Sequence, residues 1–488
     1  MNFLAPELML QLTILVPVLA IAGIVATGRS ENLRESVSIV ASLIVLWLVI
    51  SLYNTHKAGV SVAVTWLEIL PGLTLAFRLE SMGMLFALVA GILWLVTIFY
   101  AIGYMRSHHE QNQTRFYACF ALSIASVFGV AFASNLFTLF IFYEVLTLAT
   151  YPLVTHAGTE EAKKGGRTYL GILLSTSIAF FLFAILGTYV VSGTLEFTPG
   201  GVFPAGTSPV VGGALLALFV FGVGKAAIMP FHRWLPAAMV APTPVSALLH
   251  AVAVVKAGAF TLLKVGTFIF GLDFLAELPT KNALLYLAGA SVIIASLIAM
   301  RQDNLKKRLA YSTVSQLSYI TAGMLLATES GITGGAMHIA MHAVGKITLF
   351  FCAGAILVTA HKTDVSQLRG IGWQMPITMA AFMIGTLSII GLPPTGGAWS
   401  KWFELSGALD ADQVFFMGVL MLSSLLNIAY LMPISVLAFF PPPDGLARPA
   451  FKEAPLPSLL ALSFTALMCL VLFFFPEALF ELAESITQ

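Results

Sequence analysis

The chain has 488 residues, of which 59% are hydrophobic and only 10% are charged, and its formal net charge is +1. Soluble domains carry about 25% charged residues, so this composition excludes an ordinary soluble enzyme and predicts a multi-pass membrane protein. The three cysteines (Cys119, Cys352 and Cys469) lie far apart in apolar segments, which predicts neither a disulfide framework nor a metal cluster.

Segments that are long and apolar enough to cross a bilayer recur along the whole chain. At about 20 apolar residues per span, the sequence predicts an all-α integral membrane fold with about fourteen transmembrane helices. No basic segment precedes the first apolar run, so we expect no cleavable signal peptide. The predicted spans are residues 6–27, 35–53, 81–104, 116–133, 135–156, 168–192, 209–230, 243–270, 282–300, 308–327, 331–360, 373–391 with a broken continuation to 408, 413–440 and 456–476.

Basic residues between these spans are distributed very unevenly. If the N-terminus lies outside, the cytoplasmic loops hold sixteen lysines and arginines, and the opposite loops hold three. This asymmetry follows the positive-inside rule and predicts that orientation in a cell (inner) membrane. The sixteen are Arg29, Arg34, Arg106, Arg115, Lys163, Lys164, Arg167, Arg233, Arg301, Lys306, Lys307, Arg308, Lys362, Arg369, Arg448 and Lys452, and the three are Lys57, Arg78 and Lys281.

Two ionisable residues lie deep inside predicted spans of the first half. Glu144 lies in the fifth span, where Thr147 and Tyr151 share its helical face, and Lys225 lies in the seventh. A carboxylate and an amine in apolar surroundings can keep each other ionised, and separating them favours proton loss from the lysine. The pair is therefore a candidate proton switch, and the alternative is an ion pair that only locks two helices. Ionisable residues inside membranes are functional by default, which favours the switch.

The segment from Gly222 to Phe260 is apolar but is interrupted by prolines at positions 230, 236, 242 and 244. A lysine in the middle of a membrane helix costs about 2.5–3.5 kcal/mol on insertion scales. A broken backbone is tolerated only where it is buried in protein or lines a watery cavity. We therefore interpret this segment as the middle of an ion pathway.

Three further residues of the eighth span are candidate proton carriers, and the alternative role differs from one to the next. Lys256 falls in the middle of the span and is expected to belong to the central chain of ionisable groups. For His250, a proton relay and simple core packing remain equal alternatives. Lys264 lies two turns further on, and its alternative is a side chain that extends to the membrane surface.

The eleventh span contains His338, His342 and Lys346 at a spacing of four residues, so the three line one helical face. Histidine titrates near neutral pH and can both donate and accept, which favours a proton relay. Two histidines at this spacing could also bind zinc, but no nearby Cys, Asp or Glu completes such a site. The remaining alternative is a polar seam that satisfies backbone carbonyls of a neighbouring helix.

A second broken segment, SIIGLPPTGGAWSKWFE, carries Lys401, with Glu404 as its expected local partner. Two interrupted segments in corresponding positions indicate an inverted repeat with a central ion site. Five-helix repeats formed by spans 4–8 and 9–13 place one break in the fourth helix of each. The expected divisions are residues 1–115 (three N-terminal helices), 116–271 (repeat 1), 272–441 (repeat 2) and 442–488 (the last helix).

Four motifs carry a family resemblance: PFHRWLPAAMVAPTPVSALLHAVAVVKAGAF, NLKKRLAYSTVSQLSYI, HIAMHAVGKITLFF and GLPPTGGAW. They resemble the antiporter-like subunits shared by respiratory complex I, membrane-bound hydrogenases and Mrp-type multisubunit cation/proton antiporters. The resemblance implies fourteen helices, two inverted five-helix repeats and a hydrophilic axis at mid-membrane. It also implies that Glu144 pairs with Lys225, that Lys256 is the helix-eight lysine, and that Lys401 ends the axis.

Length and the helix-twelve lysine favour a D-like subunit of an Mrp-type sodium/proton antiporter. This resemblance implies a transporter subunit rather than an enzyme, with other membrane subunits, protons, Na⁺ and the lipid bilayer as partners, and with no cofactor, metal or nucleic acid. The alternatives are a proton-pumping subunit of a complex I-type NADH dehydrogenase or hydrogenase, a coupling subunit for a task such as inorganic carbon uptake, and, least favoured, a scaffold. The candidate proton-carrying residues are Glu144, Lys225, His250, Lys256, His338, His342, Lys346 and Lys401.

Overall fold

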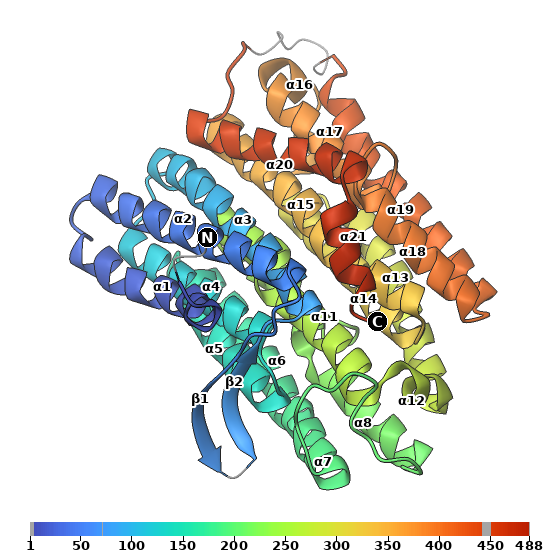
Figure 1. Cartoon of the computed structure of the whole chain (residues 1–488). Coiled ribbons are helices and arrows are strands. Elements are labelled where there is room, and N and C mark those ends of the chain that lie inside the picture. The colour runs from blue at the N-terminus through green and yellow to red at the C-terminus, as the bar shows by residue number, and fades with distance from the viewer. Residues whose placement is uncertain (1–3, 71, 442–449, 488) are drawn as a thin grey trace.

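The computed structural model describes residues 4–70, 72–441 and 450–487, which form a bundle of long helices with one β-hairpin at its edge (Figure 1). The N-terminal part pairs α1 with α2, and α3 runs from the hairpin into the bundle. The elements of this part are α1 (Pro6–Ala26), α2 (Glu31–Lys57), β1 (Ala63–Leu70), β2 (Leu73–Arg78) and α3 (Ser81–Ser107).

The next part contains the first broken span. A π-helical turn joins α6 to α7, and short helices fill the segment between α8 and α10. The elements are α4 (Gln113–Phe132), α5 (Leu136–Val154), α6 (Glu160–Thr176), η1 (Ser177–Phe181), α7 (Leu182–Ser192), α8 (Pro209–Gly222), η2 (Gly224–Ala226), α9 (Trp234–Ala237), η3 (Ala238–Val240), α10 (Thr243–Ala247), η4 (Leu248–Val252), α11 (Val254–Val265) and η5 (Gly266–Phe270).

The last part contains the longest helix and the second broken span, α17 followed by α18. The elements are α12 (Leu272–Glu277), α13 (Pro279–Arg301), α14 (Leu305–Leu325), α15 (Glu329–Ala360), η6 (Val365–Gln367), α16 (Ile371–Gln374), α17 (Pro376–Ile390), α18 (Gly397–Asp410), α19 (Val414–Ala438), α20 (Leu456–Phe474) and α21 (Glu477–Glu484).

The predicted helical membrane fold is confirmed. Within the described ranges, eleven helices are long and apolar enough to cross a membrane. The shorter apolar helices α8 and α17 fill the two broken spans, and α14 fills the tenth. Together they occupy the predicted positions in chain order, and the membrane crossing of these last three stays a prediction.

The β-hairpin between α2 and α3 lies where the sequence analysis proposes only a loop. Its strands pair antiparallel, with Ala63 opposite Arg78 and Leu70 opposite Leu73. The signal is present in the sequence, because Val64, Trp66 and nearby apolar residues alternate with others on either side of a Pro-Gly pair. These strands are much shorter than a membrane span, so the apolar segments of membrane length do not reveal them.

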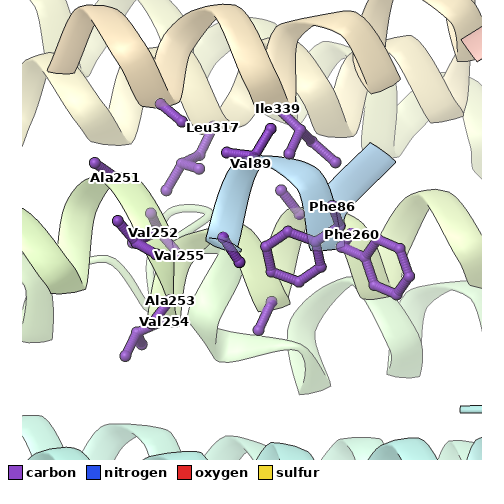
Figure 2. Packing of buried hydrophobic residues seen from close by; sticks show 14 of the residues in the cluster. Phe86, Val89, Ala251, Val252, Ala253, Val254, Val255, Phe260, Leu317 and Ile339 are labelled. Atoms are coloured by element: carbon purple, nitrogen blue, oxygen red, sulfur yellow. The ribbon is translucent and has the colours of Figure 1, made fainter. Parts of the chain in front are cut away.

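The centre of the bundle is the segment from Thr243 to Phe270, in which every residue is buried. A helix that is apolar around its whole circumference lies in the interior of a large protein, so this burial follows from its sequence. Figure 2 shows α3 residues Phe86 and Val89 packed among side chains of η4, α11, α14 and α15. The rings of Phe86 and Phe260 lie 5.0 Å apart. The buried position of this segment places Lys256 in the middle of the protein.

Loops that are predicted to share one side of the membrane contact one another in the structure. Arg34 donates to the side chain of Gln113 at 2.6 Å, and Arg115 donates to the carbonyl of His156 at 3.0 Å. Lys306 donates to the carbonyl of Ala241 at 2.5 Å. We call this side of the bundle the basic face. Arg448, which the charge count includes, lies outside the described residues.

The opposite side carries the β-hairpin, and we call it the hairpin face. The amide of Thr198 donates to the carbonyl of Phe268 at 3.1 Å, and Ser485 donates to Ser81 at 2.8 Å. Arg78 donates to the carbonyl of Phe197 at 3.3 Å. Loops therefore alternate between two faces, which is the arrangement that the charge asymmetry predicts.

Candidate functional site

The first helix break holds Lys225 in the interior. After α8 ends at Gly222, the chain makes the single turn η2, which contains Lys225. The indole nitrogen of Trp234 donates to the carbonyl of Gly224 at 2.9 Å, so one acceptor released by the break is satisfied. This is the condition under which irregular backbone persists at membrane depth.

Close packing of glycine fixes the position of this break. A Cβ at Gly258 of α11 would lie 2.4 Å from the carbonyl carbon of Lys225 and 2.4 Å from the amide nitrogen of Ala226. No real Cβ contact is this short, so only glycine allows η2 to lie directly against α11. The break thus brings Lys225 beside the helix that carries Lys256.

We expect Gly258→Ala to destabilise the folded protein by about 1–3 kcal/mol, because backbone atoms must move to accept the methyl group. Gly171 of α6 is the matched control, since a Cβ there meets no atom within 4 Å. Gly171→Ala should stabilise the protein by about 0.5–1 kcal/mol through helix propensity alone. Thermal unfolding of the purified protein measures both shifts. Equal shifts in the two variants would contradict the close approach.

Lys225 binds α5 on both sides of Glu144. Its ammonium donates to the carbonyl of Tyr143 at 2.8 Å and to the hydroxyl of Thr147 at 2.6 Å. It also lies 3.1 Å from the centre of the Tyr143 ring. Neither buried oxygen of Glu144 has a hydrogen-bond partner among the described residues, and no ion pair there joins Glu144 to Lys225. The structure therefore places the Lys225 ammonium beside the turn of α5 that carries Glu144. The ammonium and the Glu144 carboxylate do not form an ion pair in this state.

The centre of the site joins α11 to α15. The Lys256 ammonium contacts Nδ1 of His342, and both side chains are buried. The rings of His342 and His338 stack with centres 5.6 Å apart. Nδ1 of His338 lies 2.9 Å from the hydroxyl of Ser400. A file of proton-binding groups thus runs from the middle of α11 to α18, and it includes both histidines of the predicted relay.

Lys401 lies beyond Ser400 in the second broken span. Its ammonium donates to the carbonyl of Ile390 at 3.0 Å and to Ser424 at 3.2 Å, and it lies 4.9 Å from the centre of the Tyr319 ring. Glu404 is not its ion-pair partner, because neither oxygen of Glu404 has a hydrogen-bond partner in the described ranges. A direct hydrogen bond between Lys401 and Glu404 is therefore absent among the described residues, and the two charges influence each other only through space. The lysine points back toward the helix break, while the backbone and Cγ of Glu404 pack against Gly334 of α15.

Lys346 forms a branch of the site rather than a step in the file. Its ammonium donates to the hydroxyl of Ser312 at 2.6 Å and to the carbonyl of Leu309 at 3.3 Å. The hydroxyl of Tyr430 donates to the same serine at 2.8 Å. Lys346 shares the α15 face with the histidines, but its hydrogen-bond partners Ser312 and Leu309 lie on α14.

The structure leaves both alternatives for His250 open but decides between those for Lys264. The His250 ring lies 4.6 Å from that of Phe350, and neither ring nitrogen has a protein partner among the described residues. Lys264 does not extend to the surface: its side chain is fully buried and forms an ion pair with Glu80. The surface alternative for Lys264 is therefore wrong, and both residues belong to the interior.

Several residues that contact the lysines, His338 or the groups beside them are not candidates in the sequence analysis. Hydroxyls and aromatic rings occur throughout membrane helices, and Glu80 lies just before a predicted span, so the role of each residue depends on which helix packs opposite. The pair Tyr143 and Thr147 has a weak signal, since both flank Glu144 on α5. The residues are Glu80, Tyr143, Trp234, Ser312, Tyr319, Ser400, Ser424 and Tyr430.

Comparisons with known proteins identify the family of the chain. The family described as NADH:quinone oxidoreductase/Mrp antiporter, TM matches residues 133–427, more than half of the chain. A protein named NADH-quinone oxidoreductase subunit N, from Desulforudis audaxviator (strain MP104C), is 35% identical over 386 residues, covering 76% of this chain and 74% of that protein. NAD(P)H-quinone oxidoreductase chain 5 from Synechocystis sp. is 31% identical over 70% of this chain, which spans about half (51%) of that relative.

Two solved structures share the fold over nearly the whole length. A chain of the Mrp complex from Dietzia sp. DQ12-45-1b superposes with a TM-score of 0.86 and 22% identity, covering 98% of this chain and 97% of that one. A chain of the membrane-bound sulfane sulfur reductase, described as an archaeal respiratory membrane complex, gives a TM-score of 0.85 with 22% identity and covers 98% of both chains. The fold is therefore that of membrane subunits found in multisubunit complexes.

Proposed function

Because the chain belongs to the NADH:quinone oxidoreductase/Mrp antiporter family, we propose that it is the proton-translocating subunit of a multisubunit monovalent cation (Na⁺)/H⁺ antiporter. One observation carries the proposal: a buried file of proton-binding side chains runs from α11, against which the first helix break packs, to the second broken helix. Lys225, Lys256 and His342 are 0–2% exposed, and the file ends at Lys401. Buried lysines at this density are costly in a membrane and have no use in a passive scaffold.

Each residue has a defined task in the proposed pathway. Lys256 passes its proton to His342, whose ring stacks on His338, and Ser400 relays to the second break at Lys401. Lys225 alternates between the Tyr143 and Thr147 contacts and an ion pair with Glu144. Lys346 tunes the charge of the file from the side, and His250 is an additional relay beside it. The membrane potential contributes about 2.3 kcal/mol per charge per 100 mV.

A redox-driven proton pump is the second candidate. The observation that favours it is the 35% identity to the subunit N relative, over three quarters of both chains. In that case the same residues carry protons, and electron transfer takes place in partner subunits of a complex I-type dehydrogenase or hydrogenase. Under both candidates this chain is a transporter subunit and is not itself a catalyst of redox chemistry.

The proposal includes two inverted repeats, residues 116–271 and 272–441, preceded by residues 1–115 and followed by residues 442–488. Matched helix caps support this division. Asn135 caps α5 and Asn304 caps α14, the second helix of each repeat, while Thr159 and Thr328 cap the third helices. Isolated bridges join Asn135 to Glu196 and Asn304 to Asp364 in the same relation.

The proposed setting is a cell (inner) membrane with the N-terminus outside, so that the basic face is cytoplasmic. The charge asymmetry supports this orientation. Large apolar side chains on the outer helices, such as Val190 at 82% and Val210 at 79% exposure, suit contact with lipid or with other membrane subunits. The proposed partners are therefore those subunits, protons and Na⁺.

Ion exchange by the complete complex in everted vesicles tests the proposed function. Addition of Na⁺ without an electron donor should collapse a preformed proton gradient, and vesicles lacking the complex should not respond. Proton movement that occurs only after an electron donor is added would support the redox pump instead. Proton movement under neither condition would contradict both candidates.

A further inference from the structure

A cavity of about 530 Å³ opens on the hairpin face, between the hairpin and the last residues of the chain. Its wall combines polar and ionisable side chains with apolar ones such as Phe197, Phe268 and Leu272. The ionisable side chains that line it are His56, Arg78, Glu80, Asp273 and Glu329. The proposed proton file, described above, does not include any of them.

The buried ion pair between Lys264 and Glu80 lies at the inner end of this cavity. The Lys264 side chain is 0% exposed, so it is closed off from solvent. The Glu80 side chain is 16% exposed, and its carboxylate reaches the cavity. The Lys264 ammonium also donates to the carbonyl of Ala133 at 2.7 Å and lies 4.5 Å from the centre of the Phe197 ring. The pair therefore separates the cavity from the interior of the bundle.

The same pair faces the proton file on its other side. Lys264 follows Lys256 by eight residues within α11, so the two lysines share a helical face at an axial separation of about 12 Å. α11 and its flanking turns are buried throughout. Lys264 is thus the ionisable residue of this helix that lies between the centre of the file and the hairpin-face cavity.

We propose that Glu80 and Lys264 form a proton gate between the central lysine Lys256 and the hairpin-face cavity. This proposal rests on the proposed function. The Lys264 ammonium gives a proton to the Glu80 carboxylate, which leaves a neutral amine and a carboxylic acid. The acid releases this proton to water in the cavity, and the amine receives the next proton from the side of Lys256. Reversal of the same steps admits protons from the cavity.

Neighbouring charges determine how easily the gate opens. Arg78 approaches Glu196 at 3.6 Å, and its positive charge near the gate opposes a second positive charge on Lys264. His56 lies 3.1 Å from Ser81, the residue next to Glu80. Asp273 and Glu329 give the cavity wall negative charge, which attracts cations and protons leaving the gate. This arrangement favours transfer of the lysine proton toward the cavity.

Glu80→Gln keeps the shape of the side chain but removes the proton acceptor, so we expect proton-coupled transport by the intact complex to fall about tenfold. Glu481→Gln is the matched control, because Glu481 pairs with Lys57 on the same face but in an exposed position. The control should retain wild-type transport. Wild-type transport by Glu80→Gln would overturn the gate. If Lys225→Ala still abolishes transport in that case, the proposed function survives.

A double variant separates a gate from a purely structural ion pair. A buried ion pair can often be replaced by apolar residues of similar size without loss of stability. Glu80→Leu with Lys264→Met should therefore assemble like the wild type and yet transport about as poorly as Glu80→Gln. Normal transport by an assembled double variant would show that the pair is only structural.

Access to the cavity provides an independent measurement. Ser485 is exposed and lines the cavity, where it contacts Ser81 beside the gate, so we expect Ser485→Cys to react with a membrane-impermeant thiosulfonate added from the outside of intact cells. The wild-type chain, with its own three cysteines, is the background control. Labelling from the cytoplasmic side only would place the cavity on the wrong side for an outer gate and overturn it.

Discussion

Lys225→Ala is expected to lower proton-coupled ion transport at least about 100-fold, because it removes a group that must bind and release each proton. The substitution leaves the partners of this lysine, the Tyr143 carbonyl and the Thr147 hydroxyl, inside the bundle. The Thr147 hydroxyl can turn to another acceptor, so the assembled complex should persist. Transport in vesicles, normalised to the amount of assembled complex, is the measurement.

Two further variants identify which property of Lys225 is required. Lys163→Ala removes an exposed lysine paired with Glu160, and surface pairs of this kind contribute about 0–1 kcal/mol, so transport should be unchanged. Lys225→Arg keeps the positive charge but cannot release its proton at physiological pH. We expect this variant to remain as inactive as Lys225→Ala. Recovery of transport in the arginine variant would mean that only the charge is needed.

Because Glu144 and Lys225 are separated in the structure, a variant that favours their ion pair is expected to slow transport. Thr147→Val removes one of the hydrogen bonds that keep Lys225 away from Glu144. Without that bond the ion pair with Glu144 gains stability relative to the separated state, so the switch should rest closed and transport should slow. Glu144→Gln should remove this dependence on Thr147, because the competing partner is then uncharged.

The positions of the spans follow from the sequence because helix length in a membrane is set by the bilayer. The predicted break in the span 209–230 is confirmed, and α8 ends at Gly222, eight residues before the predicted end of the span. The cause is tertiary: η2 packs against Gly258 and Trp234 satisfies the Gly224 carbonyl. Neither contact can be inferred from local sequence, although Pro230 signals that the helix must break nearby.

The ionisable residues of the file are also predictable from sequence, since a lysine or glutamate inside an apolar span is conspicuous. Their partners are less predictable. Glu404 lies three residues after Lys401, yet the lysine turns toward Ile390 and Ser424. Glu80 lies at the end of the hairpin, 184 positions before Lys264, and only the folded chain brings them together.

Lys256→Met is expected to reduce transport at least about 100-fold while assembly is maintained or improved. Methionine resembles the lysine side chain in length and is apolar, so it should fit the fully buried site in α11 without the cost of a charged group. A loss of transport together with unchanged or higher stability identifies Lys256 as a functional lysine, because loss of a structural lysine would lower both. Thermal stability of the purified complex and vesicle transport measure them separately.

His342 determines how this result is interpreted, because its Nδ1 is the contact of Lys256 with the rest of the file. If protons pass from Lys256 to His342, then His342→Phe should block transport almost as fully as Lys256→Met, and the double variant should be no worse than either single one. His250→Phe is the control of equal size, since its ring packs on Phe350 without a protein hydrogen bond in the described chain. It should cost less transport than His342→Phe. Effects of Lys256 and His342 that multiply in the double variant would contradict a single file, because two steps of one path cannot be blocked independently.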